Sequence, residues 1–385
     1  MTTVRFQSVS RAKATVLLLV ILALPSIAQQ QKKMSKILNT LPPSYEDGAA
    51  RLLTSSATVT NFTHAYTFPS AIAGTTNFSF TMVGTDPSKG SATTTVPVFI
   101  VPVKLVFNGG TIVRDPHQTI PGTTQTSLGD VPKSPIFQSL AWKAANGASV
   151  GTTQYTDALQ RASFWNSVST VAPNYHVLLG TPTILPTLVI TVPTTVGSGS
   201  NNFNESSGST TNIVNVGLVD QGFLDAQFKS YITAHTQITP NTLPIFMTYQ
   251  TYLTANNGTV CCIGGYHTAT GSASAPQTYM HFSWIHGVPL ITFGETVATL
   301  SHEAAEWAAD PFIDNFTPCF IDGGGVLEVG DVLAGLDIDA VSSGITFQVQ
   351  VMNLVSYFTG DFPSKAVNKQ FTFPPSLLKF PCSLM

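Results

Sequence analysis

VATLSHEAAEWAADP, residues 297–311, has the spacing of an amphipathic helix built around the motif HEAAE, residues 302–306. A helix turns by about 100° per residue, and one side of this one is apolar, with Val297, Leu300, Ala304, Trp307 and Ala308. The opposite side is polar, with Glu295, Thr299, His302, Glu306, Asp310 and, at its edge, Glu303. His302 and Glu306 stand one turn apart, so the helix can offer two ligands to one metal ion.

Both ends of this helix have recognisable signals. Thr292 and Glu295 form a capping box just before the helix, in which each side chain satisfies a free backbone N–H. Asp310-Pro311 should end the helix, because proline disfavours helical geometry in the residue before it.

The charges around the motif are one-sided. No Lys or Arg occurs from Ser230 to Ser364, a stretch of 135 residues that holds 11 of the 20 acidic residues. A solvated helix usually alternates acids with bases, so a short motif on a solvated face explains this pattern poorly. A bound cation would compensate the charge, and distant basic residues or solvent exposure are the alternatives.

A complete metal site needs a third ligand from beyond the helix. Glu328 and Asp331 form an E-x-x-D pair after a run of three glycines and can fold back onto the helix. Asp310 is a second candidate and Asp314 a weaker one. One imidazole with carboxylates suits Zn²⁺ best among the usual ions, while Mn²⁺, Fe²⁺ and Ca²⁺ also accept this donor set.

The beginning of the chain is typical of a secretory signal peptide. Three basic residues precede the apolar run Val16–Leu24, and Ser26-Ile27-Ala28 is typical of a cleavage site. We therefore expect residues 1–28 to be removed and the protein to be secreted, to the medium, the periplasm or the cell surface. The run is shorter than the roughly 18 residues that span a bilayer, and an uncleaved anchor is the alternative.

Removal of residues 1–28 leaves 14 Lys and Arg against 20 Asp and Glu. This acidic balance argues against nucleic acid and anionic membranes as partners. After removal of the signal, no later stretch is long and apolar enough to span a membrane.

Four cysteines remain in the chain: Cys261, Cys262, Cys319 and Cys382. In an oxidising compartment an even number predicts two disulfides. A bond between the adjacent Cys261 and Cys262 would be strained, so each is expected to pair with Cys319 or Cys382. Zinc ligation by these thiols is the minor alternative.

Most of the chain favours strands. Residues 29–60 are polar and resemble a linker or lead-in, and residues 61–200 form a β-rich region. Its expected strands are Asn77–Val83, Val96–Phe107 and Ile184–Val196, and the prolines of the second suggest sheet edges or bulges.

Residues 201–385 form an α+β region that carries the motif helix, either separate from residues 61–200 or continuous with them. Gly197–Asn212 is low in complexity and predicts a surface loop or subdomain boundary. Beyond it we expect a helix over Asp220–His235, and strands over Leu243–Leu253 and Ile345–Phe358. The fold class is therefore α+β, rich in strands and with few helices.

The motif resembles the H-E-x-x-H signature of zincin metallopeptidases, and the E-x-x-D pair is similar to the third-ligand segment of their thermolysin-like branch. The resemblance implies that His302, Glu306 and Glu328 are ligands and that Glu303 is the general base for a metal-bound water. Glu306 departs from the signature, which has its second histidine at this position.

A broader resemblance covers roughly residues 210–360. Cys262-x-x-Gly265-Tyr266-His267, the S-H-E-x-x-E-x-x-x-D-P helix and the E-x-x-D pair look like the pattern of the extracellular exordium (phosphate-induced protein) family and its bacterial relatives. This order marks His267 as a second imidazole near the metal, or as a hydrogen-bond donor to a transition state; a turn histidine is the alternative. His281 and His286 are expected to pack rather than to react.

Two functions follow from these features. The first is a secreted, zincin-like metal-dependent hydrolase that acts on a peptide or protein substrate. The second is a non-catalytic extracellular or wall-associated protein, in which the same helix carries a structural ion or a carboxylate cluster.

Overall fold

The computed structural model describes residues 58–70, 74–207, 210–256, 258–287, 296–317 and 325–377. Within these ranges strands outnumber helices, which is consistent with the expected strand-rich α+β fold. The expected signal peptide and most of the expected lead-in lie outside the described residues. None of the described helices combines the length and the apolar character needed to cross a membrane.

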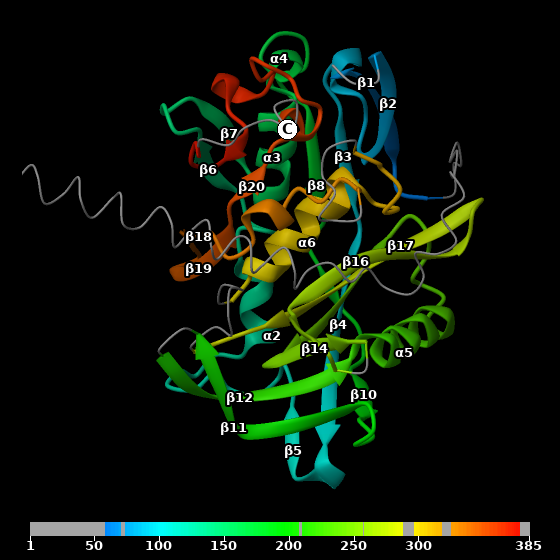
Figure 1. Ribbon diagram of the computed structural model, residues 1–385, viewed down its shortest axis with the longest axis vertical. Helices are drawn as coiled ribbons and strands as arrows, with labels where there is room; N and C mark the ends of the chain where they lie inside the picture. Colours follow the sequence, from blue (N-terminus) through cyan, green and yellow to red (C-terminus); the bar gives the residue numbers. More distant parts are fainter. Residues whose placement is uncertain are drawn as a thin grey trace, which may run out of the picture.

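A seven-stranded mixed sheet forms the centre of the molecule (Figure 1). Its main path runs β10 (Leu188–Thr191), β4 (Val98–Phe107), β13 (Leu243–Tyr249), β17 (Ala275–Trp284) and β16 (Gly265–Ser272). The first four are mutually parallel, while β16 runs antiparallel to β17 at the end of the path. Two short strands, β5 (Ile112–Arg114) and β9 (Thr183–Ile184), also pair with β4.

This sheet joins the two halves of the chain. The strands β4, β9 and β10 come from the region 61–200, while β13, β16 and β17 come from the region 201–385. The pairing of β4 with β13 runs from Leu243 opposite Val98 to Met247 opposite Pro102. The two regions therefore contribute strands to one shared sheet.

The expectation that prolines place Val96–Phe107 at an edge is wrong, because β4 has neighbours on both sides. Pro97 separates β4 from the short β3 (Thr93–Val96). Pro102 lies within β4, between the part that pairs with β9 and the part that pairs with β10. Its missing N–H falls at the junction of two short neighbours, so the sheet tolerates a proline at its centre.

A second correction concerns Gly197–Asn212, which is not a loop. It forms β11 (Gly197–Ser207) and the start of β12 (Thr210–Asp220), an antiparallel hairpin. With β14 (Thr251–Ala255) and β15 (Val260–Ile263) the hairpin makes a four-stranded sheet, seen at the bottom of Figure 1. A Cβ added to Gly217 would lie 2.6 Å from the Phe107 ring. One of the small residues of this hairpin therefore permits close packing.

Five strand pairs and six α-helices complete the described fold. The pairs are β1 (Asn61–Ser70) with β2 (Gly74–Val83), β3 with β8 (His176–Leu179), β6 (Leu140–Lys143) with β7 (Ser149–Thr153), β18 (Asp337–Ser342) with β19 (Ile345–Gln350), and β20 (Met352–Asn353) with β21 (Thr372–Phe373). The helices are α2 (Ser127–Asp130), α3 (Tyr155–Ser163), α4 (Trp165–Val168), α5 (Gln221–Ala234), α6 (Ala298–Ala309) and α7 (Val355–Phe358).

Several predicted elements appear, some of them divided. The strand over Asn77–Val83 is part of β2, and the helix over Asp220–His235 is α5, whose N-terminus the Asp220 carboxylate caps. The single strand expected over Leu243–Leu253 breaks at Gln250, which has a φ of 48°. The late strand expected over Ile345–Phe358 is divided into the two strands β19 and β20, and its last residues form helix α7 instead.

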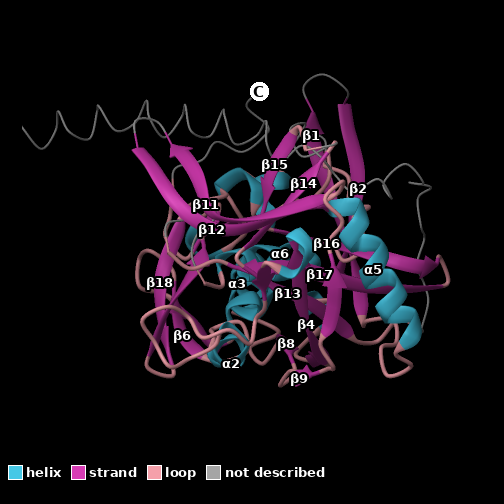
Figure 2. Ribbon diagram, turned by 90° about the horizontal axis from the view of Figure 1, so that it is seen from below, coloured by secondary structure: helices cyan, strands magenta, loops and turns pink. Residues whose placement is uncertain are grey.

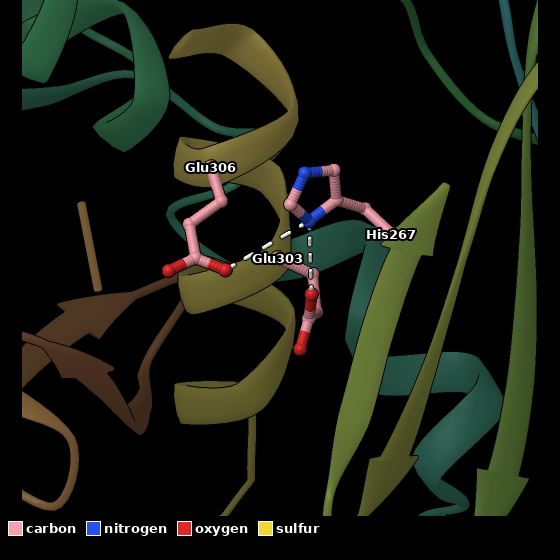
Figure 3. Close-up of side chains that lie close together, drawn as sticks. All are labelled: His267, Glu303 and Glu306. Carbon is pink, nitrogen blue, oxygen red and sulfur yellow. Dashed lines mark hydrogen bonds and ion pairs between the residues drawn. The ribbon is translucent and has the colours of Figure 1, made fainter. Parts of the chain in front are cut away.

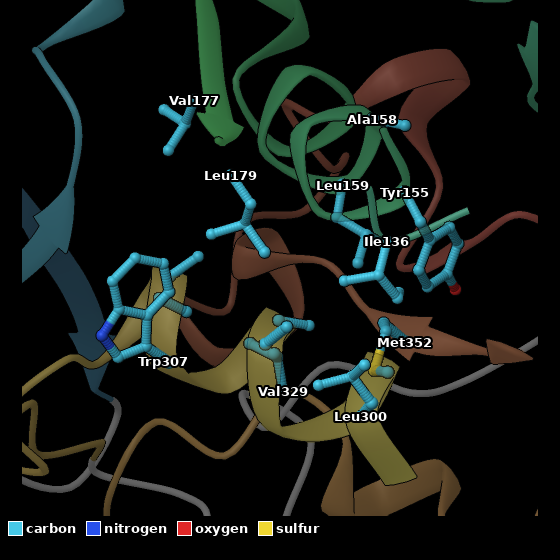
Figure 4. Packing of buried hydrophobic residues seen from close by; sticks show 14 of the residues in the cluster. Ile136, Tyr155, Ala158, Leu159, Val177, Leu179, Leu300, Trp307, Val329 and Met352 are labelled. Atoms are coloured by element: carbon cyan, nitrogen blue, oxygen red, sulfur yellow. The ribbon is translucent and has the colours of Figure 1, made fainter. Parts of the chain in front are cut away.

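Helix α6 is the buried centre of the larger core (Figures 1 and 2). All twelve of its residues are buried. Its apolar side chains, among them Leu300 and Trp307, belong to the same core cluster as Leu159 of α3 and Met352 of β20 (Figure 4). A polar helix face that is buried rather than solvated must find partners within the protein.

The predicted cysteine pairing is wrong for two of the four residues. Cys261 and Cys262 form a disulfide with each other, within β15. Their pairing leaves neither of them a thiol for Cys319 or Cys382, both of which lie outside the described residues.

Candidate metal centre

Helix α6 places the motif at the contact between the central sheet and the C-terminal part of the chain. It begins at Ala298, with Val297 at the N-cap and no side-chain cap. The expected capping-box residues, Thr292 and Glu295, lie outside the described residues. The helix ends at Ala309 before Asp310-Pro311, as predicted.

One group of donor atoms contains His302, Glu306 and Asp331, all within 4.8 Å of one another. His302 Nε2 lies 2.9 Å from Glu306 Oε2 and 3.5 Å from Asp331 Oδ1. Asp331 begins the short 3-10 helix η5 (Asp331–Leu333). The chain beyond the glycine run thus folds back onto the helix, and Asp331 is the acid of the E-x-x-D pair that joins the group.

A second group contains His267, Glu303 and Glu306. His267 Nδ1 lies 3.4 Å from Glu303 Oε2 and 3.8 Å from Glu306 Oε2. Figure 3 shows the imidazole reaching from β16 toward two carboxylates on successive turns of α6. The structure therefore places His267 beside the motif, and Glu306 is common to both groups.

In each imidazole, the ring nitrogen that points away from the carboxylates of α6 faces an oxygen acceptor. His302 Nδ1 lies 3.0 Å from Gln350 Oε1, and His267 Nε2 lies 3.1 Å from the carbonyl oxygen of Asp310. In the neutral form His302 then carries its proton on Nδ1 and His267 on Nε2, and the other nitrogen of each ring keeps a lone pair. Both lone pairs then face the carboxylates of α6. An oxygen acceptor at the other ring nitrogen is the usual arrangement of histidines that bind metal ions.

Burial and neighbouring charges oppose each other at the two histidines. Burial lowers the pKa of His302, but Glu306, Glu303 and Asp331 outweigh it and hold the pKa well above its usual value. Burial likewise lowers the pKa of His267, and the hydrogen bond with Glu303 and the charge of Glu306 raise it overall. Each imidazole is therefore stabilised as a cation by the acids around it.

Of the carboxyl groups around the two histidines, Glu306 has a lowered pKa, while Glu303 and Asp331 have raised pKa values. Burial would raise the pKa of Glu306, but His302, His267 and the Gly330 N–H lower it overall. Burial raises the pKa of Glu303. Burial, followed by the charge of Glu306, raises the pKa of Asp331 to about 8. The cluster holds more acids than its imidazoles can neutralise, so a bound cation would relieve the repulsion among them.

Glu328, the third ligand that the family resemblance implies, lies in neither donor group. It is buried, and burial, the charges of Glu306, Asp331 and Asp310, and a hydrogen bond with Glu306 raise its pKa well above the usual value. Glu328 therefore lies beside Glu306 in the same buried, acid-rich environment.

Asp310 also lies outside both donor groups. Its carboxylate accepts hydrogen bonds from the backbone N–H groups of Asp314 and Asn315 and so shapes the turn after the helix. Burial raises its pKa to about 7. The backbone carbonyl of Asp310, rather than its side chain, faces His267.

His281 packs, as predicted. It is fully buried on β17, where Nε2 lies 3.0 Å from Thr248 Oγ1 and the ring stacks on Phe228. Burial lowers its pKa to about 3. His286 follows β17, and its backbone N–H and carbonyl bond to the Gln250 side chain.

This burial predicts a pH dependence of stability. Below about pH 6.5 the unfolded chain protonates His281 and the folded protein does not, so its contribution to stability is present above pH 6.5 and lost as the pH falls toward 3. We expect the free energy of unfolding to fall by on the order of a few kcal/mol over this range. His281→Phe should lose less over the same range in denaturant titrations; parallel curves for the two proteins would contradict this assignment.

Sequence patterns did not reveal Gln350 and Gly330. Gln350 is buried at the end of β19, and Gly330 precedes Asp331. Gly330 N donates to Glu306 Oε1 at 2.9 Å, and Gln350 Nε2 donates to the Gly330 carbonyl at 2.7 Å. A lone glutamine in a strand carries no spacing signal, so only the tertiary contacts identify it.

Comparisons with protein-family models, curated proteins and solved structures found no match to this chain.

Proposed function

We propose that the protein is a secreted metal-dependent hydrolase, a zincin-like peptidase whose ion is held by His302, Glu306 and Asp331. The observation that carries this proposal is the convergence of these three donors beside the pair formed by Glu303 and His267. Ligands and a buried acid–base pair are the two components that metal-assisted hydrolysis requires. Secretion follows from the expected signal peptide.

The donor set fits a divalent ion, with zinc favoured. Imidazole nitrogen and carboxylate oxygen are both zinc ligands, and catalytic zinc sites keep a further position for water. The 2.9 Å contact of His302 Nε2 with Glu306 Oε2 is that of a proton-sharing pair, and an ion would replace this proton. Mn²⁺, Fe²⁺ and Ca²⁺ accept the same oxygen-rich set.

The residues of the chain would then divide the work of peptide hydrolysis. A bound zinc ion supplies Lewis-acid polarisation of the substrate carbonyl and lowers the pKa of a water molecule. Glu303 accepts the proton of the attacking water and returns it to the amine as the C–N bond breaks. In its protonated form His267, whose Nδ1 lies 3.4 Å from Glu303 Oε2, orients this carboxylate and stabilises its charge. Burial raises the pKa of Glu303, which favours the protonated form that the carboxyl group takes after it accepts the proton of the water.

Deep burial favours a second candidate, a non-catalytic extracellular protein with a structural ion or carboxylate cluster. The side chains of His302 and Glu306 are only 6% and 3% exposed. A structural ion is enclosed by protein ligands, while a catalytic ion keeps a position open to water. In this case metal removal would lower the melting temperature, and no hydrolysis would accompany the ion.

Metal content of the mature protein tests both candidates. We expect the wild type to bind one zinc ion per chain in elemental analysis, and His302→Ala to bind none, because it removes the only nitrogen donor of the group. The matched control is His117→Ala. This histidine is exposed and distant in sequence from His302, so the variant should keep the metal. A wild type that binds no divalent ion would contradict the hydrolase proposal.

A further inference from the structure

Gln350 is buried at the end of β19, only 2% exposed, and all of its polar groups have partners. Its backbone N–H donates to Ser301 Oγ on α6, and its carbonyl accepts from the Tyr155 hydroxyl of α3. Strand β19 and two helices therefore fix this residue at both backbone groups. A side chain held by such a backbone has little freedom to reorient.

The two ends of the Gln350 amide can be assigned from their partners. The Gly330 carbonyl only accepts hydrogen bonds, so the amide NH₂ faces it, at 2.7 Å. The amide oxygen then faces His302 Nδ1, at 3.0 Å. An oxygen acceptor at Nδ1 favours the tautomer that carries its proton there and leaves the lone pair on Nε2.

The same amide also fixes the third donor. Gly330 receives the Gln350 amide at its carbonyl and donates its own N–H to Glu306 Oε1. The next residue is Asp331. A Cβ at position 330 would lie 2.6 Å from His302 Nδ1, so only glycine lets the backbone approach the imidazole this closely. His302, Gln350, Gly330 and Glu306 thus form a closed ring of polar contacts.

We propose that Gln350 is a positioning residue of the metal centre: it selects Nε2 as the donor of His302 and, through Gly330, holds Asp331 at the ion. This inference rests on the proposed metal site. The partners of metal-binding histidines typically change metal affinity about 10- to 100-fold when they are removed. Gln350 acts through His302 and does not itself contact the ion.

The test is zinc affinity, measured by competition with a chromophoric chelator. Gln350→Met has a similar length but no hydrogen-bonding amide, and it should bind zinc about 10- to 100-fold more weakly than the wild type. Gln350→Glu keeps an oxygen at His302 Nδ1, so its zinc affinity should lie between those of Gln350→Met and the wild type. The matched control is Gln348→Met, two residues earlier on β19 and outside this ring, with affinity close to that of the wild type.

A second readout needs no variant. In zinc-loaded wild type with ¹⁵N-labelled histidine, the NMR signals of His302 should show ligation through Nε2 and a slowly exchanging proton on Nδ1. Ligation through Nδ1, or unchanged zinc affinity in folded Gln350→Met, would overturn this inference while the metal site stands. A wild type that binds no divalent ion would instead overturn the proposed function.

Discussion

Replacement of Glu303 by glutamine is expected to lower hydrolysis of a peptide substrate by about 10²- to 10⁴-fold, the usual contribution of a general acid–base group. Glutamine has nearly the same shape but cannot accept the proton of the attacking water. Glu303 is buried beside His267 and lies outside the group of His302, Glu306 and Asp331 that would hold the ion. The loss should therefore appear in kcat, while zinc content stays that of the wild type.

A mixed peptide library, assayed with and without a chelator, gives the measurement. Asp339→Asn removes an exposed carboxylate on β18 and serves as the matched control, with activity close to that of the wild type. If the wild type cleaves peptides and both chelation and Glu303→Gln leave the rate unchanged, the proposed mechanism is wrong. Stable zinc binding with no hydrolysis in any protein would favour the structural-ion candidate.

The substitution Trp307→Ala should lower the free energy of unfolding by about 3–5 kcal/mol, the range found for large aromatic side chains in cores. Trp307 is fully buried on the apolar side of α6, and its Nε1 donates to Thr278 Oγ1 of β17 at 3.1 Å. Alanine would leave a cavity where the Trp307 ring lies in the core (Figure 4) and would remove the donor to the Thr278 hydroxyl.

Urea denaturation of the mature protein measures this loss. Trp307→Phe fills much of the cavity and should lose less than alanine does. The exposed Phe362, at 78% of its full accessibility, provides the control, and Phe362→Ala should change stability by less than about 0.5 kcal/mol. A change below 1 kcal/mol for Trp307→Ala would show that α6 is not the centre of the core.

Local patterns predicted α6 and its C-terminal end. The spacing of Leu300, Trp307 and the small residues between them predicts a helix, and proline at 311 stops it. Helical spacing also predicted α5, to which the structure adds the Asp220 cap. These features depend on neighbours within a few residues, which the sequence contains in full.

Local patterns failed where distant contacts determine the structure. Gly197–Asn212 has the composition of a loop, yet it pairs as part of the hairpin β11–β12, in which Gly199 and Gly217 approach Ile112 and Phe107 closely. Pro102 suggests an edge, yet it occupies a gap between two short strands that pair with β4. Cys261 pairs with Cys262, although local geometry argues against the bond.

For the candidate site, the sequence by itself determined that His302 and Glu306 share one helix face and that the acids around them lack basic neighbours. Helical periodicity and residue counts are enough for both statements. Only the tertiary structure grouped Asp331 with His302 and Glu306, set His267 of β16 beside Glu303 and revealed Gln350. Those choices depend on how β16, β19 and the segment before Asp331 pack on α6, at separations of 20 to 50 residues over which sequence spacing carries no positional information.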